Sequence, residues 1–274
     1  MLGVATTQRG RRMGPQQISL SRGSRFAVGL NCWYPMANQS CWGTNRLLDC
    51  SPYNSNHANF YGLESTDWKL IGRAAIESDG SSDYVSAPSA PQFDLSGTNY
   101  TISLWVNITG GVSWAGIIAK GDGSGNDWTI QRASGGSNMR VYHANSSREF
   151  SGLWGDLENR GWTLLTVTFD GTDIEVYFDG DSQATSSSPA AITHDSNKAV
   201  HVMSERTGRS FAGMCDDVRI YKRRLSPAEI TQLFSETRSG GYGSLTLPMG
   251  PRIWPIDTLD EAADFPYNIY YGGI

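Results

Sequence analysis

The chain has 274 residues, of which 18% are charged, and its net charge is −5. This length suits one large all-β domain or two small ones, and it allows a core that needs no disulfide or metal for stability. No apolar run approaches the ~20 residues of a membrane-spanning helix, and no apolar stretch follows the basic start as in a signal peptide, so neither membrane insertion nor export is expected.

The first 24 residues are polar, basic and aperiodic, and they are predicted to form an arm. No acidic residue precedes Asp49, whereas six arginines do, among them Arg9, Arg11 and Arg12. That stretch therefore carries +6, and since the whole chain carries −5, the remainder carries −11. The asymmetry favours docking on an acidic protein surface, and a solvated, partly disordered terminus is the alternative. Nucleic acid is not an expected partner, because no aromatic residue lies nearby to stack on bases.

From residue 25 the pattern changes to short segments in which apolar and polar residues alternate, as in β-strands. Single strands are predicted within 25–36, 101–109 and 211–225. Pairs of short strands joined by turns are predicted within 47–63, 73–88, 116–133, 139–152 and 161–181. The pair at 73–88 has Asp79-Gly80 between its strands, which is a strong hairpin signal. In 101–109, Trp105 should face the side opposite to Ile102, Leu104, Val106 and Ile108.

One helix is predicted, over residues 226–238. Ser226 is a suitable N-cap, Pro227 fits the first turn, and Glu229 would complete a capping box. Ile230, Leu233 and Phe234 form one apolar stripe.

The stretch 239–274 is rich in proline and aromatic residues. The prolines exclude a helix or a central strand. The aromatic residues, too apolar for a free tail, are Trp254, Phe265, Tyr267, Tyr270 and Tyr271. We expect this extension to lie in a groove of its own sandwich, of a sister subunit or of another protein, and with the basic arm to serve assembly.

Four segments stand out within residues 32–234: LLDCSPYNSNHANFYG, IESDGSSDYVSAP, YTISLWVNI and FAGMCDDVRIYKRRLSPAEITQLF. In their order and spacing they resemble the laminin-G-like, concanavalin A-like jelly-roll family. It implies an all-β fold, a two-sheet antiparallel jelly-roll sandwich over 25–238 with one short C-terminal-side helix and extended arms at 1–24 and 239–274. The whole layout is also similar to structural proteins of tailed bacteriophages.

The resemblance implies a binding or structural role, since the family includes glycan-binding modules, adhesion domains and virion proteins. The leading hypothesis is a non-enzymatic virion structural protein, a capsid decoration or head-appendage subunit made in the host cytoplasm. Its partners would be the major capsid protein or sister subunits in a homo-oligomer, and its outer surface would contact host glycans. The alternative is a free-standing carbohydrate-binding or adhesion module.

Sugars stack on exposed aromatic side chains because their C–H faces are apolar. The aromatic residues predicted near loops or strand ends are Trp114, Trp128, Tyr142 and Trp154. They are the candidate glycan-binding residues, and packing in the core or at an interface is the alternative.

Calcium is the one cofactor considered. Asp49 and Asp217 match acidic positions through which some members of the family bind it. Asp122 and Asp127 flank a glycine-rich loop with hard oxygen ligands. An EF-hand is excluded, because position twelve of that loop is Ala133, and a plain hairpin tip is the alternative.

No catalytic residues are predicted. Glucanases with this sandwich need two carboxylates on one strand face. The acidic cluster of 173–181 does not supply them, because Asp173 and Asp179 fall in turns and Glu175 alternates with core residues. The histidines lie in no nucleophile motif.

The cysteines Cys32, Cys41, Cys50 and Cys215 form no Cys-x-x-Cys pair, which argues against a zinc site. Without an export signal, free buried thiols are expected rather than disulfides.

Overall fold

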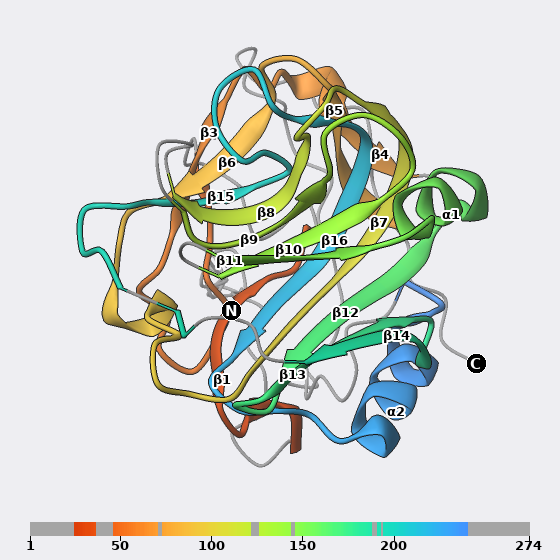
Figure 1. The fold of residues 1–274 in the computed structure, drawn as a ribbon. Helices are drawn as coiled ribbons and strands as arrows, with labels where there is room; N and C mark the ends of the chain where they lie inside the picture. The colour runs from red at the N-terminus through yellow and green to blue at the C-terminus, as the bar shows by residue number, and fades with distance from the viewer. Residues whose placement is uncertain are drawn as a thin grey trace, which may run out of the picture.

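The computed structural model describes residues 25–36, 46–70, 73–121, 126–143, 146–187, 191–192 and 194–240. These residues form two antiparallel sheets of eight strands each, packed as a sandwich (Figure 1). The predicted all-β sandwich is therefore confirmed. The basic arm and almost all of the 239–274 extension lie outside the described residues. With them lie the predicted assembly residues Arg9, Arg11, Arg12, Trp254, Phe265, Tyr267, Tyr270 and Tyr271.

We call the first sheet the β7 sheet, after its long central strand. Its order is β14-β13-β12-β7-β16-β5-β4, and β1 also pairs with β16. Its strands are β1 (Leu30–Tyr34), β4 (Trp68–Leu70), β5 (Ala74–Asp79), β7 (Tyr100–Gly111), β12 (Thr163–Phe169), β13 (Asp173–Phe178), β14 (Asp181–Ser187) and β16 (Phe211–Tyr221).

We call the second sheet the β9 sheet. Its order is β11-β10-β9-β8-β15-β6-β3-β2. Its strands are β2 (Arg46–Leu47), β3 (Ala58–Tyr61), β6 (Tyr84–Ala87), β8 (Gly116–Gly121), β9 (Asn126–Arg132), β10 (Met139–His143), β11 (Ser146–Phe150) and β15 (Val200–Val202).

The main hydrophobic core lies between the two sheets. Strand β7 contributes to it with alternate residues, as predicted: Ile102, Leu104, Val106 and Ile108 are all buried there. Trp105 belongs instead to a second hydrophobic cluster on the outer face of the β7 sheet.

Helix α2 (Pro227–Thr237) forms that second cluster with the outer face of the β7 sheet. Its predicted capping box at Ser226 and Glu229 is present. Ile230 and Leu233 are buried against the sheet, and Trp105 Nε1 donates a hydrogen bond to Thr237 Oγ1 at 2.9 Å. Figure 1 shows α2 beside β13 and β14. One outer face of the sandwich is thus covered by a helix.

A second helix, α1 (Leu153–Arg160), was not predicted. Leu153, Trp154 and Leu157 turn into the main core, so α1 closes one end of the sandwich. The helix is bracketed by Gly152 and Gly161, both with positive φ, rather than by an N-capping serine, threonine or aspartate. The expectation of a single helix was wrong, because α1 has neither the N-capping serine nor the N-terminal proline that mark α2 in the sequence.

The predicted hairpin at Asp79-Gly80 is also wrong. Strands β5 and β6 belong to different sheets, so the chain crosses from one sheet to the other between them. The backbone N–H of Asp79 donates to Asp83 Oδ2 at 3.0 Å, and Ser81 N donates to Asp79 Oδ1 at 2.7 Å. These hydrogen bonds stabilise a wider connection than a two-residue turn. The strand pairs predicted within 116–133, 139–152 and 161–181 are confirmed.

The three described cysteines, Cys32, Cys50 and Cys215, are buried, and no disulfide joins them to one another. Burial raises the thiol pKa of Cys32 and of Cys215 well above its ordinary value. No helix in the described part of the chain is long and apolar enough to cross a membrane.

Candidate ligand-binding face

No described helix packs on the outer face of the β9 sheet, and side chains cross this face in two rows. The first row contains His201, Ala119, Thr129 and Tyr142. The second contains Gln131, Arg140 and Glu149. Directly paired residues of neighbouring strands share a face. Because Ile130 and Val141, which alternate with these residues, lie in the main core, both rows point away from it.

Arg140 lies between two aromatic side chains at one end of this face. Its guanidinium carbon is 5.0 Å from the ring centroid of Trp114 and 5.2 Å from that of Tyr142. Trp114 comes from the turn between β7 and β8, and all three side chains are half-buried. We call these three residues the Arg140 cluster. Cation–π contacts of this kind are worth roughly 0.5–2 kcal/mol each.

Trp114 has a backbone conformation that side chains with a Cβ rarely adopt. Its φ is +67°, in the left-handed region. This costs roughly 1–2 kcal/mol in a residue other than glycine. Such strain persists where the surrounding structure imposes it and is concentrated at functional sites. In Trp114 the strained backbone accompanies an indole ring that lies against the Arg140 guanidinium. This indicates that the position of the ring is important for the site.

Two buried polar side chains lie beside the Arg140 cluster on strand β9. Thr129 is 1% exposed and pairs with Tyr142, and Gln131 is 3% exposed and pairs with Arg140. Thr129 Oγ1, Gln131 Oε1 and Arg140 Nε are buried, and none has a hydrogen-bond partner among the described residues. A buried polar atom without a partner costs roughly 1–3 kcal/mol. Hydroxyl groups of a ligand, or water, would satisfy these atoms.

A row of stacked rings lies at the other end of the same face. Tyr61 and Tyr84 are parallel, with centroids 4.8 Å apart, and Tyr84 stacks on His201 at 5.3 Å. Each inner ring face in this row is covered by its neighbour. Tyr61, at one end of the row, is exposed and could stack on a ligand.

Two of the four predicted glycan-binding residues are placed in the core. Trp128 is 1% exposed, and its Nε1 donates to the carbonyl of Phe93 at 3.3 Å. Trp154 is fully buried, and its Nε1 donates to Glu158 Oε1 at 2.5 Å. A buried ring cannot stack on a sugar, so for these two residues the alternative of core packing is correct. Trp114 and Tyr142 are brought together by Arg140.

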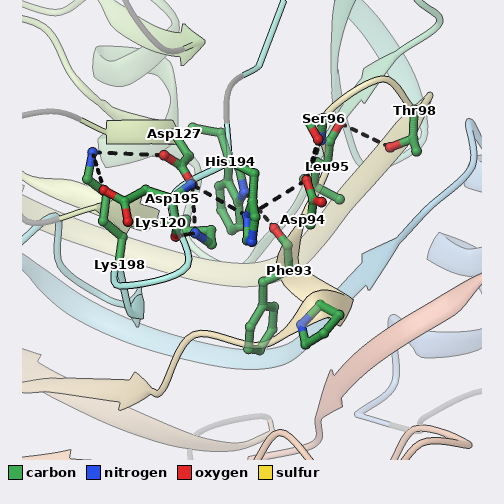
Figure 2. A network of polar contacts seen from close by, with 12 residues as sticks. Phe93, Asp94, Leu95, Ser96, Thr98, Lys120, Asp127, His194, Asp195 and Lys198 are labelled. Atoms are coloured by element: carbon green, nitrogen blue, oxygen red, sulfur yellow. Dashed lines mark hydrogen bonds and ion pairs between the residues drawn. The ribbon is translucent and has the colours of Figure 1, made fainter.

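A lysine neutralises the carboxylate of Asp127, which is one of the residues predicted for a calcium site. Lys120 Nζ is 2.6 Å from Asp127 Oδ2, and the N–H of Asp195 donates to the same oxygen at 2.9 Å (Figure 2). Lys120 also donates to the carbonyl of Asp195, and Lys198 lies 3.9 Å from Asp127 Oδ1. An ammonium group therefore occupies the place of a metal ion. The other predicted ligand of this loop, Asp122, lies outside the described residues.

Asp49 and Asp217 also do not fit a metal, because both are buried and serve as hydrogen-bond acceptors for the protein. Asp49 accepts hydrogen bonds from the backbone of Trp33, Ser51 and Asn56 and from the Asn56 amide. Asp217 accepts from Trp33 Nε1 at 2.6 Å and forms two hydrogen bonds with Arg219. Within the described ranges, no three histidine, cysteine or acidic side chains are grouped as a metal site requires.

The acidic cluster considered for catalysis is dispersed among structural contacts. Arg224 binds Glu175 at 2.9 Å and Asp170 at 2.6 Å, and Asp179 accepts a hydrogen bond from Leu164 N. Of the residues named on the ligand-binding face, Glu149 alone has a carboxylate, whereas glycoside hydrolysis uses a pair.

Residues 79–231 match the family described as the concanavalin A-like lectin/glucanases superfamily, over more than half of the chain. The chain belongs to this superfamily. The resemblance inferred from the sequence motifs is thereby confirmed for the superfamily, and the layout of phage structural proteins stays a prediction. No relative was found among curated proteins.

Solved structures with the same fold include binding domains of botulinum neurotoxins and a domain of an arabinanase. The receptor binding domain of botulinum neurotoxin C/D mosaic serotype is 14% identical with a TM-score of 0.55, over 76% of this chain and 51% of that one. The binding domain of botulinum neurotoxin DC in complex with SialylT is 17% identical with a TM-score of 0.56, over 77% and 52%. This superfamily member thus spans about half the length of the toxin domains.

Domain 4 of AbnA, a GH43 extracellular arabinanase from Geobacillus stearothermophilus, was solved in complex with arabinotriose. It is 18% identical with a TM-score of 0.54, over 75% of this chain and 98% of that one. At these identities the likeness concerns the fold alone.

The residues of the face that sequence reasoning missed are Thr129, Gln131 and Arg140. Each is a polar residue in a strand, and such residues normally belong to a solvated face. Their common signal is the alternation in TIQRASGGSNMRVYH, in which the core residue Ile130 separates Thr129 from Gln131 and the core residue Val141 separates Arg140 from Tyr142. The pairing of β9 with β10 places Thr129 beside Tyr142 and Gln131 beside Arg140, and the sequence alone does not show that these strands pair.

Proposed function

We propose that this superfamily member binds carbohydrate without catalysis, through the outer face of the β9 sheet. The observation that carries the proposal is the Arg140 cluster beside the buried, unpartnered oxygens of Thr129 and Gln131. A saccharide can bind both the rings and the oxygens, since its C–H faces stack on aromatic rings and its hydroxyls donate to oxygen acceptors.

Two of the structural neighbours support a saccharide as the class of ligand. The arabinanase domain was solved with arabinotriose, and another toxin binding domain, of botulinum neurotoxin serotype D, was solved with N-acetylneuraminic acid. These ligands belong to those proteins, and they make this fold a reasonable scaffold for sugar binding. The geometry of this chain indicates which residues would bind the sugar.

Removing either ring of the Arg140 cluster should weaken saccharide binding at least roughly tenfold, as for a central aromatic contact. The full chain is first screened on an array of neutral and acidic glycans, and the affinity for the strongest binder is then measured by calorimetry. The variants are Tyr142→Ala and Trp114→Gly. Glycine is chosen at 114 because it adopts φ +67° without strain, so the fold should be retained.

Tyr53→Ala is the matched control, because Tyr53 is 54% exposed in the loop between β2 and β3. It should bind like the wild type. The proposal is refuted if no glycan on the array binds. It is equally refuted if both cluster variants bind as tightly as the control.

We also propose a setting for this binding: a virion, in which the chain is a capsid decoration or head-appendage subunit of a tailed phage. Support comes from the sequence, namely the +6 charge of the stretch before Asp49, the aromatic extension and the similarity to phage structural proteins. An outward-facing sandwich that binds host glycans is compatible with arms bound to capsid protein or sister subunits.

The virion proposal predicts a fixed number of copies per particle, measured by quantitative mass spectrometry of purified particles. Deleting residues 1–24 or 245–274 should release the protein from the particle while the sandwich stays folded. A protein that is absent from particles, or that stays bound after both deletions, would contradict it.

A further inference from the structure

Arg140 is an arginine whose charge is not neutralised by any residue in the described part of the chain. No ion pair or hydrogen bond joins its side chain to any residue that the structure describes, and its contacts are the rings of Trp114 and Tyr142. Its Nε is buried and lacks an acceptor. A guanidinium has five N–H donors and cannot lose its charge in a protein.

Other arginines of the same sandwich show what Arg140 lacks. Arg73 binds Asp216 at 2.8 Å, Arg219 binds Asp217 with two hydrogen bonds, and Arg224 binds two carboxylates. The aromatic contacts of Arg140 hold its guanidinium in place but satisfy none of its donors. A half-buried, fixed and unpaired guanidinium is suited to a planar anion, which it binds with two parallel hydrogen bonds.

We propose that the saccharide bound at this face is acidic and that its carboxylate binds Arg140. The inference rests on the proposed function in that the ligand is taken to be a saccharide. It goes further by assigning the chemical class and the residue that selects it.

The atoms beside Arg140 favour an acidic sugar over a simple anion. Gln131 Oε1 and Thr129 Oγ1 are buried next to the cluster without partners, and the amide oxygen can only accept a hydrogen bond. A sugar hydroxyl can donate to that oxygen, whereas a fully ionised anion cannot. The rings of Trp114 and Tyr142 add a surface for the apolar C–H face of the sugar. Carboxylate, hydroxyls and an apolar face occur together in sialic and uronic acids.

Glu149 is the nearest competitor for Arg140 by position, because the two are directly paired between β10 and β11. Glu149 is exposed, and no ion pair joins it to Arg140. Its negative charge should repel an acidic ligand. Removing this charge therefore tests the sign of the electrostatic effect without removing a contact of the ligand.

The experiment compares each acidic saccharide with its own methyl ester, which differs by one methyl group on each carboxylate and carries no charge. The probes are N-acetylneuraminyl-lactose and trigalacturonate, each as free acid and as ester, measured by calorimetry on the full chain. For the acid that binds, the wild type should prefer it over its ester roughly ten- to hundredfold, the range for a hydrogen-bonded charge pair. Arg140→Met should abolish this preference, because it should weaken binding of the acid much more than binding of the ester. Arg140→Lys should keep part of it, and Glu149→Gln should increase the affinity for the acid.

The outcomes separate this inference from the proposed function. If acid and ester bind the wild type equally, and Tyr142→Ala weakens both, the face binds sugar but the inference is wrong. The inference is also wrong if Arg140→Met weakens both forms by the same factor while its urea midpoint matches the wild type. If neither these probes nor any glycan on the array binds, the proposed function fails as well.

Discussion

Asp49→Ala should lower the free energy of unfolding by about 4–6 kcal/mol, because four buried donors lose their acceptor at once. Both carboxylate oxygens are used: the backbone N–H groups of Trp33 and Ser51 donate to Oδ1, at 3.1 and 2.9 Å. The backbone and amide N–H groups of Asn56 donate to Oδ2, at 3.2 and 2.9 Å. Since domains are stable by only about 5–15 kcal/mol, the variant should be close to unfolding at room temperature. Urea denaturation followed by tryptophan fluorescence measures the loss.

Asp181→Ala is the control for this prediction, because Asp181 is an exposed acidic residue at the start of β14. It should shift stability by no more than about 0.5 kcal/mol. An Asp49→Ala variant as stable as this control would show that the hydrogen-bond network is not important. A rise in the wild-type urea midpoint on adding calcium, reversed by a chelator, would instead restore the calcium hypothesis for this carboxylate.

Lys120→Met should destabilise the protein by about 3–5 kcal/mol, because it leaves the carboxylate of Asp127 buried without its cation. The pair is almost completely inaccessible to solvent, with 0% and 2% of the two side chains exposed. Lys198, 3.9 Å from Asp127, is too distant to replace the direct contact of 2.6 Å. The measurement is again urea denaturation of the full chain.

The double variant Lys120→Met/Asp127→Leu tests the cause of that loss. Because neither position of the pair then carries a charge, the double variant should be more stable than Lys120→Met alone. The coupling energy between positions 120 and 127 should reach about 2–3 kcal/mol. Recovery should be incomplete, because the N–H of Asp195 also donates to Asp127. Additive effects of the two substitutions would mean that the ion pair contributes nothing.

The fold could be predicted from sequence wherever one face of a strand is apolar. Strand β7 shows the reason, since its alternating residues match the main core on one side and the second cluster on the other. Strand β14 was missed, because its sequence DSQATSS lies mostly exposed at a sheet edge and needs no apolar face. The hairpin predicted at Asp79-Gly80 was wrong for a different reason. Turn-forming residues indicate that the chain changes direction, but they do not indicate whether the next strand joins the same sheet.

The candidate site could be predicted only in part, because the direction of a side chain depends on register. Trp128 and Tyr142 were equivalent by sequence, yet Trp128 is paired with His143 and points inward, while Tyr142 is paired with Thr129 and points outward. A shift of one residue would exchange the two faces. Arg140 carried no sequence signal of its own, since its role depends on Trp114, which lies 26 positions earlier in the chain.

The position of α2 has a consequence for valency. With that helix covering the β7 sheet, the described sandwich offers a ligand the outer face of one sheet rather than two. Each copy would then engage a sugar-coated surface at one point, with the modest affinity of a single shallow contact. Strong attachment would come from several copies held together, because the second and later contacts then form at a high effective concentration.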